Sequence, residues 1–204
     1  VAIISALLGQ GIVQYEYIIG GMLVGGAIGA IAARSVAMTA MPEMVALFNG
    51  FGGAASLLVG WSALAPDAGA FTLTTIMFSI LIGGVTLTGS LIAYGKLSET
   101  ISGAAMTFGG QKIVNSLIVI GVLVSAFMFI NNPNDPNWLY AVIGLSLLFG
   151  IMAVIPIGGA DMPVVISLLN SYSGLAACAA GFAVDNNALI VAGSLVGASG
   201  IILT

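Results

Sequence analysis

The chain alternates long apolar runs with short polar breaks. The runs lie near residues 1–8, 17–33, 43–63, 71–94, 112–130, 138–155, 163–183 and 187–204, and Gly, Pro, Asn and Asp are frequent between them. An α-helix needs about 20 apolar residues to cross the hydrocarbon core of a bilayer, and the runs lack the period-two alternation of strands. We therefore predict an all-α, polytopic bundle of about eight transmembrane helices, the first truncated, forming a single domain over residues 1–204.

The composition also indicates a protein embedded in the lipid bilayer. Of the 204 residues, 60% are hydrophobic and 5% are charged, whereas soluble domains average about 25% charged residues. The net charge of −4 argues against a nucleic-acid partner, because a basic surface is needed to neutralise phosphates. The chain has no His and one Cys, Cys178, so no internal disulfide and no zinc site are expected.

The charged residues predict an orientation. If successive helices alternate across the membrane, all three basic residues fall on one side, and four acidic residues fall on the other: Arg34, Lys96 and Lys112 against Glu16, Asp67, Asp135 and Asp185. The positive-inside rule makes the first side cytoplasmic, and the chain after Thr204 then faces the cytoplasm, as do Glu43 and Asp161. We expect Lys96 and Lys112 to anchor helix ends at the headgroups.

One segment of the chain occurs twice. Met41-Pro-Glu-Met-Val-Ala-Leu-Phe-Asn49 reappears as Met162-Pro-Val-Val-Ile-Ser-Leu-Leu-Asn170, and the following helices share Gly89-Ser90-Leu91 and Gly193-Ser194-Leu195. Four helix steps separate the copies, with three helices between them, so the copies have the same orientation and form a parallel repeat. Membrane carriers and pumps often place a central site between such repeats.

The repeat contains a matched pair of amides. Asn49 and Asn170 each follow a helix-starting proline by seven residues, about 10 Å deeper along the helix axis. An amide at that depth must face protein or water, because exposing it to lipid costs free energy. It can serve as an interhelical hydrogen bond or as part of a polar pathway, and the matched pair favours the pathway. Ser90 can line the same pathway or bond the carbonyl one turn back.

Asp161 lies in the most unusual stretch, Gly158-Gly-Ala-Asp-Met-Pro163. Its carboxylate can cap the helix that Pro163 starts. Alternatively, it responds to a docked partner or to a nearby proton.

Three segments resemble one known family. These are Met41-Pro-Glu-Met-Val-Ala46, Leu87-Thr-Gly-Ser-Leu-Ile-Ala-Tyr-Gly-Lys-Leu97 and Ile157–Gly174. From about residue 17 onward the chain is similar to the membrane domain of the beta subunit of proton-translocating nicotinamide nucleotide transhydrogenases. The resemblance implies part of an enzyme that couples proton movement to hydride transfer between NADH and NADP⁺. It assigns Asn49, Ser90 and Asn170 to the proton path and Asp161 to the surface facing the NADP(H) domain.

The resemblance also implies partners and a location. It implies an NADP(H)-binding domain after residue 204, an alpha subunit, a homodimer of protomers, and a bacterial cytoplasmic or mitochondrial inner membrane. This chain itself would bind neither NADP(H), NAD(H) nor a metal. Many family members have a histidine where this chain has Asn49, so the protonatable group would come from a partner chain, or water would bridge the gap. The alternative function is a secondary transporter or channel for a small solute.

Overall fold

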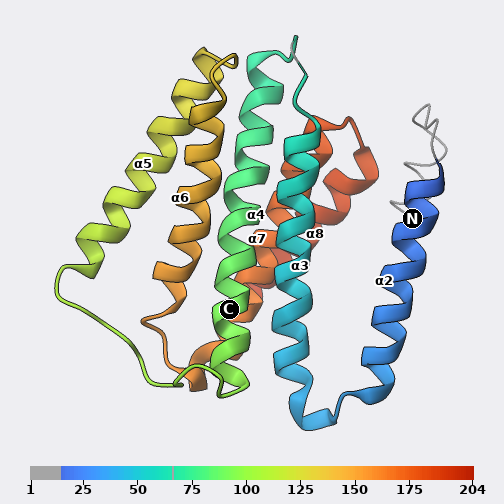
Figure 1. The fold of residues 1–204 in the computed structure, drawn as a ribbon, viewed down its shortest axis with the longest axis vertical. Coiled ribbons are helices and arrows are strands. Elements are labelled where there is room, and N and C mark those ends of the chain that lie inside the picture. Colours follow the sequence, from blue (N-terminus) through green and yellow to red (C-terminus); the bar gives the residue numbers. More distant parts are fainter. Residues whose placement is uncertain (1–14, 66) are drawn as a thin grey trace.

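The computed structural model describes residues 15–65 and 67–204, which form a bundle of helices with no strand in these two ranges (Figure 1). The helices are α2 (Tyr15–Ser35), α3 (Met41–Ser62), α4 (Ala70–Leu97), α5 (Gln111–Asn131), α6 (Pro136–Val154), α7 (Met162–Ala183) and α8 (Asn187–Leu203). Short 3₁₀ turns, η1 (Met38–Ala40) and η2 (Gly159–Asp161), precede α3 and α7. The predicted all-α fold is confirmed.

The lengths of the helices suit a membrane. Six of the described helices are long and apolar enough to span a bilayer, and α8 is shorter, at 17 residues. Successive helices alternate in direction (Figure 1), as the sequence predicted. The predicted span near residues 1–8 lies outside the described residues.

Local sequence explains where several helices begin. Pro42 and Pro163 lie in the first turns of α3 and α7, where a missing N–H leaves no intrahelical bond unmade. The Asp135 side chain accepts from the Asn137 N–H at the start of α6, and Asn186 accepts from the Leu189 N–H at the start of α8. Both are side-chain N-caps.

Helix α4 lies at the centre of the bundle and contacts α3, α5, α6 and α7. Two separate apolar clusters surround it. One joins α3, α4, α5 and α6, and includes Leu57, Ile80 and Val142. The other joins α3, α4, α6 and α7 near the end where α7 begins, and includes Ala46, Ala93 and Leu169. The polar residues described below lie between these clusters along α3 and α4.

The predicted repeat is visible as two helical hairpins, α3–α4 and α7–α8. A Cβ added to Gly53 would lie 2.7 Å from Gly83 O, and one added to Gly83 would lie 2.6 Å from Gly53 O. Gly174 and Gly193 show the same reciprocal approach, at 2.8 and 2.6 Å. Backbone contact at these crossings requires glycine. Gly193 therefore corresponds to Gly83, and the sequence match of Gly193 with Gly89 is wrong as a structural equivalence.

Each hairpin has a second close contact between its two helices, and there the positions of a glycine and a serine are exchanged between the hairpins. In the first hairpin, Gly50 of α3 faces Ser90 of α4, and an added Cβ would lie 3.3 Å from the Ser90 Cβ. In the second hairpin, Ser171 of α7 faces Gly200 of α8, at 3.2 Å by the same measure. Each hairpin thus places one glycine against one serine, but on opposite helices.

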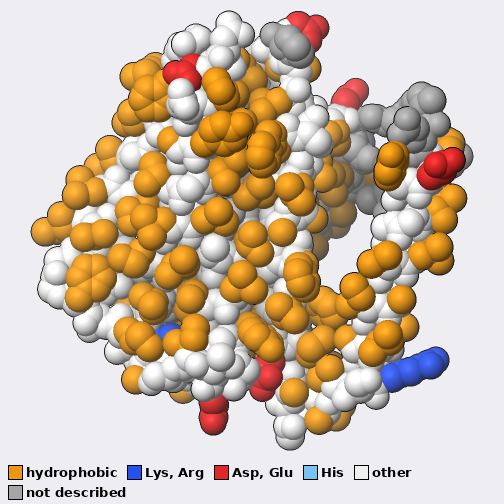
Figure 2. All heavy atoms as spheres, viewed as in Figure 1, with side chains coloured by type: hydrophobic (Ala, Val, Ile, Leu, Met, Phe, Trp, Pro, Cys, Tyr) orange, Lys and Arg blue, Asp and Glu red, His pale blue; other side chains and the backbone are white. Residues whose placement is uncertain are grey.

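Helix α2 stands apart from the other helices. It has no buried residue, and Figure 2 shows an opening between α2 and the rest of the molecule. Gly21, Gly25 and Gly29 form a small-residue ladder on one face of α2, a spacing typical of close helix packing, but nothing lies within 4 Å of a Cβ added at any of them. A packing partner for this ladder is therefore absent from the described residues.

The surface separates apolar sides from charged ends. Figure 2 shows hydrophobic side chains covering the flank of the bundle, with acidic and basic side chains gathered near its two ends. The end where α2 and α4 finish has the three basic residues and three acidic ones: Arg34, Lys96 and Lys112 with Glu43, Glu99 and Asp161. We call it the Asp161 end. The opposite, acidic end has Glu16, Asp67, Asp135 and Asp185.

Candidate functional site

Three polar side chains from three helices meet inside the bundle. Asn49 of α3 donates from Nδ2 to Ser90 Oγ of α4 at 2.9 Å. Ser173 of α7 donates from Oγ to Asn49 Oδ1, also at 2.9 Å. Asn49 is 8% exposed, and Ser90 is completely buried. We call these three residues the Asn49 cluster.

The Asn49 cluster suits proton transfer through hydroxyls better than proton storage. Both partners of the amide are hydroxyls, which can donate and accept, so the amide is satisfied in either orientation. Neither an amide nor a serine titrates near neutral pH. The cluster can therefore pass a hydrogen-bonded proton along, but it cannot hold one.

An apolar layer closes the cluster toward the Asp161 end. Each of the three helices has a buried apolar residue one turn nearer that end: Ala46 on α3, Ala93 on α4 and Leu169 on α7. One turn is about 5 Å along a helix axis. We call these three residues the apolar layer.

Buried hydroxyls continue from the cluster in the other direction. Thr86, one turn from Ser90 along α4, is completely buried, and its Oγ1 has no hydrogen-bond partner within the described residues. Farther along α4, Ser79 donates to the backbone carbonyl of Ser56 on α3 at 2.7 Å. Polar groups therefore reach from the Asn49 cluster toward the acidic end.

The structure brings together Asn49 and Ser90 but not the other two predicted residues. Asn170 is exposed on α7 and makes no hydrogen bond within the described part of the chain. The two repeat-matched amides therefore do not bond to each other or to a shared partner among the described residues, and the place of Asn170 on a proton path stays a prediction. Ser173, one turn beyond Asn170, reaches Asn49 instead, and no motif in the sequence marks it.

Asp161 lies at the surface, at the start of α7. It occupies the N-cap position, but its backbone is in the right-handed helical region and its carboxylate makes no capping hydrogen bond. Of the two interpretations of Asp161, the structure therefore gives no support to the helix cap. Its side chain is exposed at the Asp161 end.

Lys96 is also placed differently from its expectation. It is only 2% exposed, and its ammonium donates to the backbone carbonyls of Ala104, Ile155 and Ile157. The prediction that Lys96 anchors a helix end at the headgroups is therefore wrong. Lys112, in contrast, is exposed in the first turn of α5.

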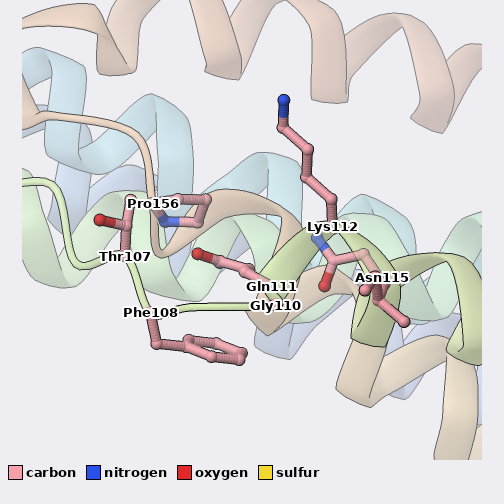
Figure 3. Close-up of a pocket in the computed structure, with 8 residues that line it drawn as sticks. Thr107, Phe108, Gly110, Gln111, Lys112, Asn115 and Pro156 are labelled. Carbon is pink, nitrogen blue, oxygen red and sulfur yellow. The ribbon is translucent and has the colours of Figure 1, made fainter.

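A hollow of about 550 Å³ lies away from the Asn49 cluster, between the loop before α5 and Pro156. Figure 3 shows the Lys112 side chain extending away from Phe108 and Pro156. The amides of Gln111 and Asn115 both donate to the Met152 carbonyl, at 3.3 Å. These two donors tie α5 to α6, whereas Asn115 Oδ1 is buried without a hydrogen-bond partner among the described residues.

One segment of α3 resembles a dinucleotide fingerprint but does not fit a nicotinamide nucleotide. Gly50-Phe-Gly52-Gly-Ala-Ala55 matches a dinucleotide fingerprint in letters, but it lies inside α3, with Gly53 against the backbone of α4. A phosphate needs the free N–H groups at the start of a helix, which the middle of α3 does not offer. In the described ranges, no three His, Cys, Asp or Glu side chains lie close enough together to hold a metal ion.

Comparison with known proteins places the chain in a family. A family model described as NAD(P) transhydrogenase beta subunit matches residues 1–204. Two curated relatives from Rhodospirillum rubrum, one specified to strain level, are both named NAD(P) transhydrogenase subunit beta. Each is 41% identical to this chain over 214 aligned positions. The alignment covers 100% of this chain and 46% of each relative.

The chain thus spans about half the length of the curated relatives it matches. The predicted resemblance is confirmed over the whole chain, including the part before residue 17. A solute transporter or channel, the alternative from sequence, is not favoured by the match. The chain belongs to the family of NAD(P) transhydrogenase beta subunits.

Proposed function

We propose that this chain is the proton-translocating membrane part of a transhydrogenase, and that the Asn49 cluster lies on its proton path. One observation supports this most strongly. The cluster is a hydrogen-bonded polar group at the junction of three helices, and its side chains Asn49 and Ser90 are buried between two apolar clusters. Interhelical bonds alone stabilise a membrane protein by only about 0.6 kcal/mol each, so stability is a weak reason to place three polar side chains there.

The proton would move through the cluster by exchange of hydrogen bonds. Each serine hydroxyl would release its own proton to neighbouring water as it accepts another, and the Asn49 amide would orient both hydroxyls while keeping its own N–H protons. Because Asn49 cannot be protonated at physiological pH, the group that holds the proton is supplied by a partner helix, or by water next to the cluster. Thr86 is the next hydroxyl in line toward the acidic end.

Access to the cluster would alternate between the two ends. In this structure, hydroxyls continue toward the acidic end, whereas the apolar layer separates the cluster from the Asp161 end. We propose that the layer opens during turnover and connects the cluster with the Asp161 end. Asp161 lies at the surface of that end and would face the NADP(H)-binding domain.

In the complete enzyme, proton movement would be coupled to hydride transfer between NADH and NADP⁺ in soluble domains. The proposed partners are the NADP(H)-binding domain beyond residue 204, the alpha subunit and a second protomer. We propose a bacterial cytoplasmic or mitochondrial inner membrane, with the Asp161 end on the cytoplasmic or matrix side. The three basic residues at that end support this orientation.

The test compares two asparagines in the complete enzyme reconstituted in vesicles. Asn49→Leu removes both hydrogen bonds and excludes water from the cluster, so we expect this variant to block proton movement. Asn49→His should be tolerated. Asn170→Leu makes the same change at an exposed, unbonded amide and serves as the control. The measurements are proton uptake during hydride transfer and thermal stability. Unchanged proton uptake in Asn49→Leu, at wild-type stability, would show that Asn49 is only a packing contact.

A further inference from the structure

Lys96 joins three segments at the Asp161 end. From the last turn of α4, its ammonium donates to Ile155 O and Ile157 O at 2.7 Å each, and to Ala104 O at 3.0 Å. Ile155 ends α6, Ile157 follows it, and Ala104 belongs to the loop between α4 and α5. One side chain therefore connects α4, the end of α6 and this loop.

The ammonium of Lys96 suits this position. A lysine ammonium has three N–H donors and no acceptor, and all three donors are matched by carbonyls. Helices α4 and α6 both end here, so their partial negative charges lie side by side and favour a cation. A neutral side chain would leave these carbonyls unpaired in a buried place. Lys96 therefore has a structural role at this position.

The bonded segments border the apolar layer. Ala93 of the layer lies one turn before Lys96 on α4, and Val154 and Ile157 pack against the same buried cluster. After Ile157, two glycines lead to η2 and Asp161. A hollow of about 500 Å³ opens here, lined by Lys96 and part of the loop after α4 on one side and by Gly159 and Ala160 on the other. Two backbone hydrogen bonds also join these segments. Gly159 N–H donates to Gly103 O at 2.8 Å, and Met106 N–H donates to Ile155 O at 3.3 Å.

We infer that Lys96 is the positioning residue that holds the apolar layer closed at the Asp161 end. Its three bonds fix the segment between α6 and Asp161 against α4, directly over the layer that separates the Asn49 cluster from that end. Loss of these bonds frees the segment and lets water reach the cluster. The inference rests on the proposed proton path and adds the residue, Lys96, that prevents protons from passing through this path without hydride transfer.

The experiment measures passive proton leak in vesicles that hold the complete enzyme without nucleotides. Lys96→Gln removes the charge and leaves too few donors for three carbonyls, so we expect the leak to rise about fivefold or more, the lower range of typical coupling between sites. Lys112→Gln removes the same charge from an exposed side chain at the same end and should leave the vesicles sealed. Asn49→Leu added to Lys96→Gln should abolish the leak, because the leak passes through the Asn49 cluster.

The outcomes separate this inference from the proposed function. A folded Lys96→Gln enzyme whose passive proton leak equals that of the wild type overturns the inference. An equal rise of the leak in Lys112→Gln also overturns it, and so does a leak that persists when Asn49→Leu is added to Lys96→Gln. If Lys96→Gln does not fold, Lys96→Arg replaces it, because a planar guanidinium cannot direct three donors onto the same three carbonyls. A sealed Arg variant, or failure of both to fold, also overturns the inference. If Asn49→Leu alone leaves coupled pumping intact, it is the proposed function that fails.

Discussion

At the scale of single residues, the same residue type has different roles according to its neighbours. Asn49 is buried between two serines, whereas its repeat partner Asn170 is exposed. Lys96 is enclosed by carbonyls, whereas Lys112 is free at the surface. Each pair therefore provides a natural control, because one substitution can be made in two environments.

One substitution at Asp161 can separate its two interpretations, a helix cap and a group that responds to a docked partner or a nearby proton. Its side chain is exposed and makes no capping hydrogen bond, so Asp161→Asn should change the free energy of unfolding by less than about 0.5 kcal/mol. If Asp161 responds to the NADP(H) domain, the same variant should lose coupled hydride transfer. The measurements are coupled transhydrogenation in vesicles and thermal unfolding of the same preparation. Wild-type coupled rates would leave Asp161 without the role we propose.

At the scale of helices, the two hairpins suggest an experiment that separates packing from chemistry. Gly50→Ser alone should crowd Ser90, whose Cβ is already 3.3 Å from an added Cβ, and should destabilise the protein by about 1–3 kcal/mol. Gly50→Ser with Ser90→Gly reproduces the arrangement of Ser171 and Gly200, so the double variant should recover most of that loss. It still lacks the hydroxyl that accepts from Asn49, so proton movement should stay low.

A double-mutant cycle checks this prediction. Thermal unfolding of the two single variants and the double variant gives the interaction energy between positions 50 and 90, and proton uptake is measured on each folded preparation. Additive destabilisation in the double variant would show that the two hairpins do not pack equivalently. Full proton uptake in the double variant would show that the Ser90 hydroxyl is dispensable.

The sequence predicted the helices and their order well, because long apolar runs with proline-led starts determine them locally. It predicted Asn49 and Ser90 from their polarity in apolar surroundings. It did not predict Ser173, because a serine is common in membrane helices and only the crossing of α3 and α7 brings this one to Asn49. It aligned Gly193 with Gly89 because both begin a Gly-Ser-Leu segment. In the structure, however, Gly193 is equivalent to Gly83, since each lies at the backbone crossing of its hairpin.

At the scale of the whole molecule, charge is unevenly divided between the two ends. The three basic residues balance three acidic ones at the Asp161 end, and the opposite end has four acidic residues and no basic one. The orientation of membrane proteins follows basic residues more than net charge. The position of the three basic residues is therefore the argument for the orientation that we propose, with the Asp161 end on the cytoplasmic or matrix side.

This orientation can be tested by labelling. In a Cys178→Ser background, a cysteine at the exposed Asn134, at the acidic end, should react with an impermeant maleimide from outside intact cells. A cysteine at the exposed Ala105, in the loop after Lys96, should react only in inverted membranes. The reverse pattern would invert the topology, and with it the side on which Asp161 meets a soluble domain.

The exchanged glycine and serine also bear on how such a molecule arose. Serine against serine at this level would force two side chains into a space that already brings one added Cβ to 3.3 Å. If both hairpins descend from one ancestral hairpin, the route from one arrangement to the other passes through glycine against glycine. The copy that changed would then have had no hydroxyl at this level for a time. Close helix packing is kept throughout such a route, so the hydroxyl that now bonds Asn49 can be gained or lost in one copy without disturbing the fold of its hairpin.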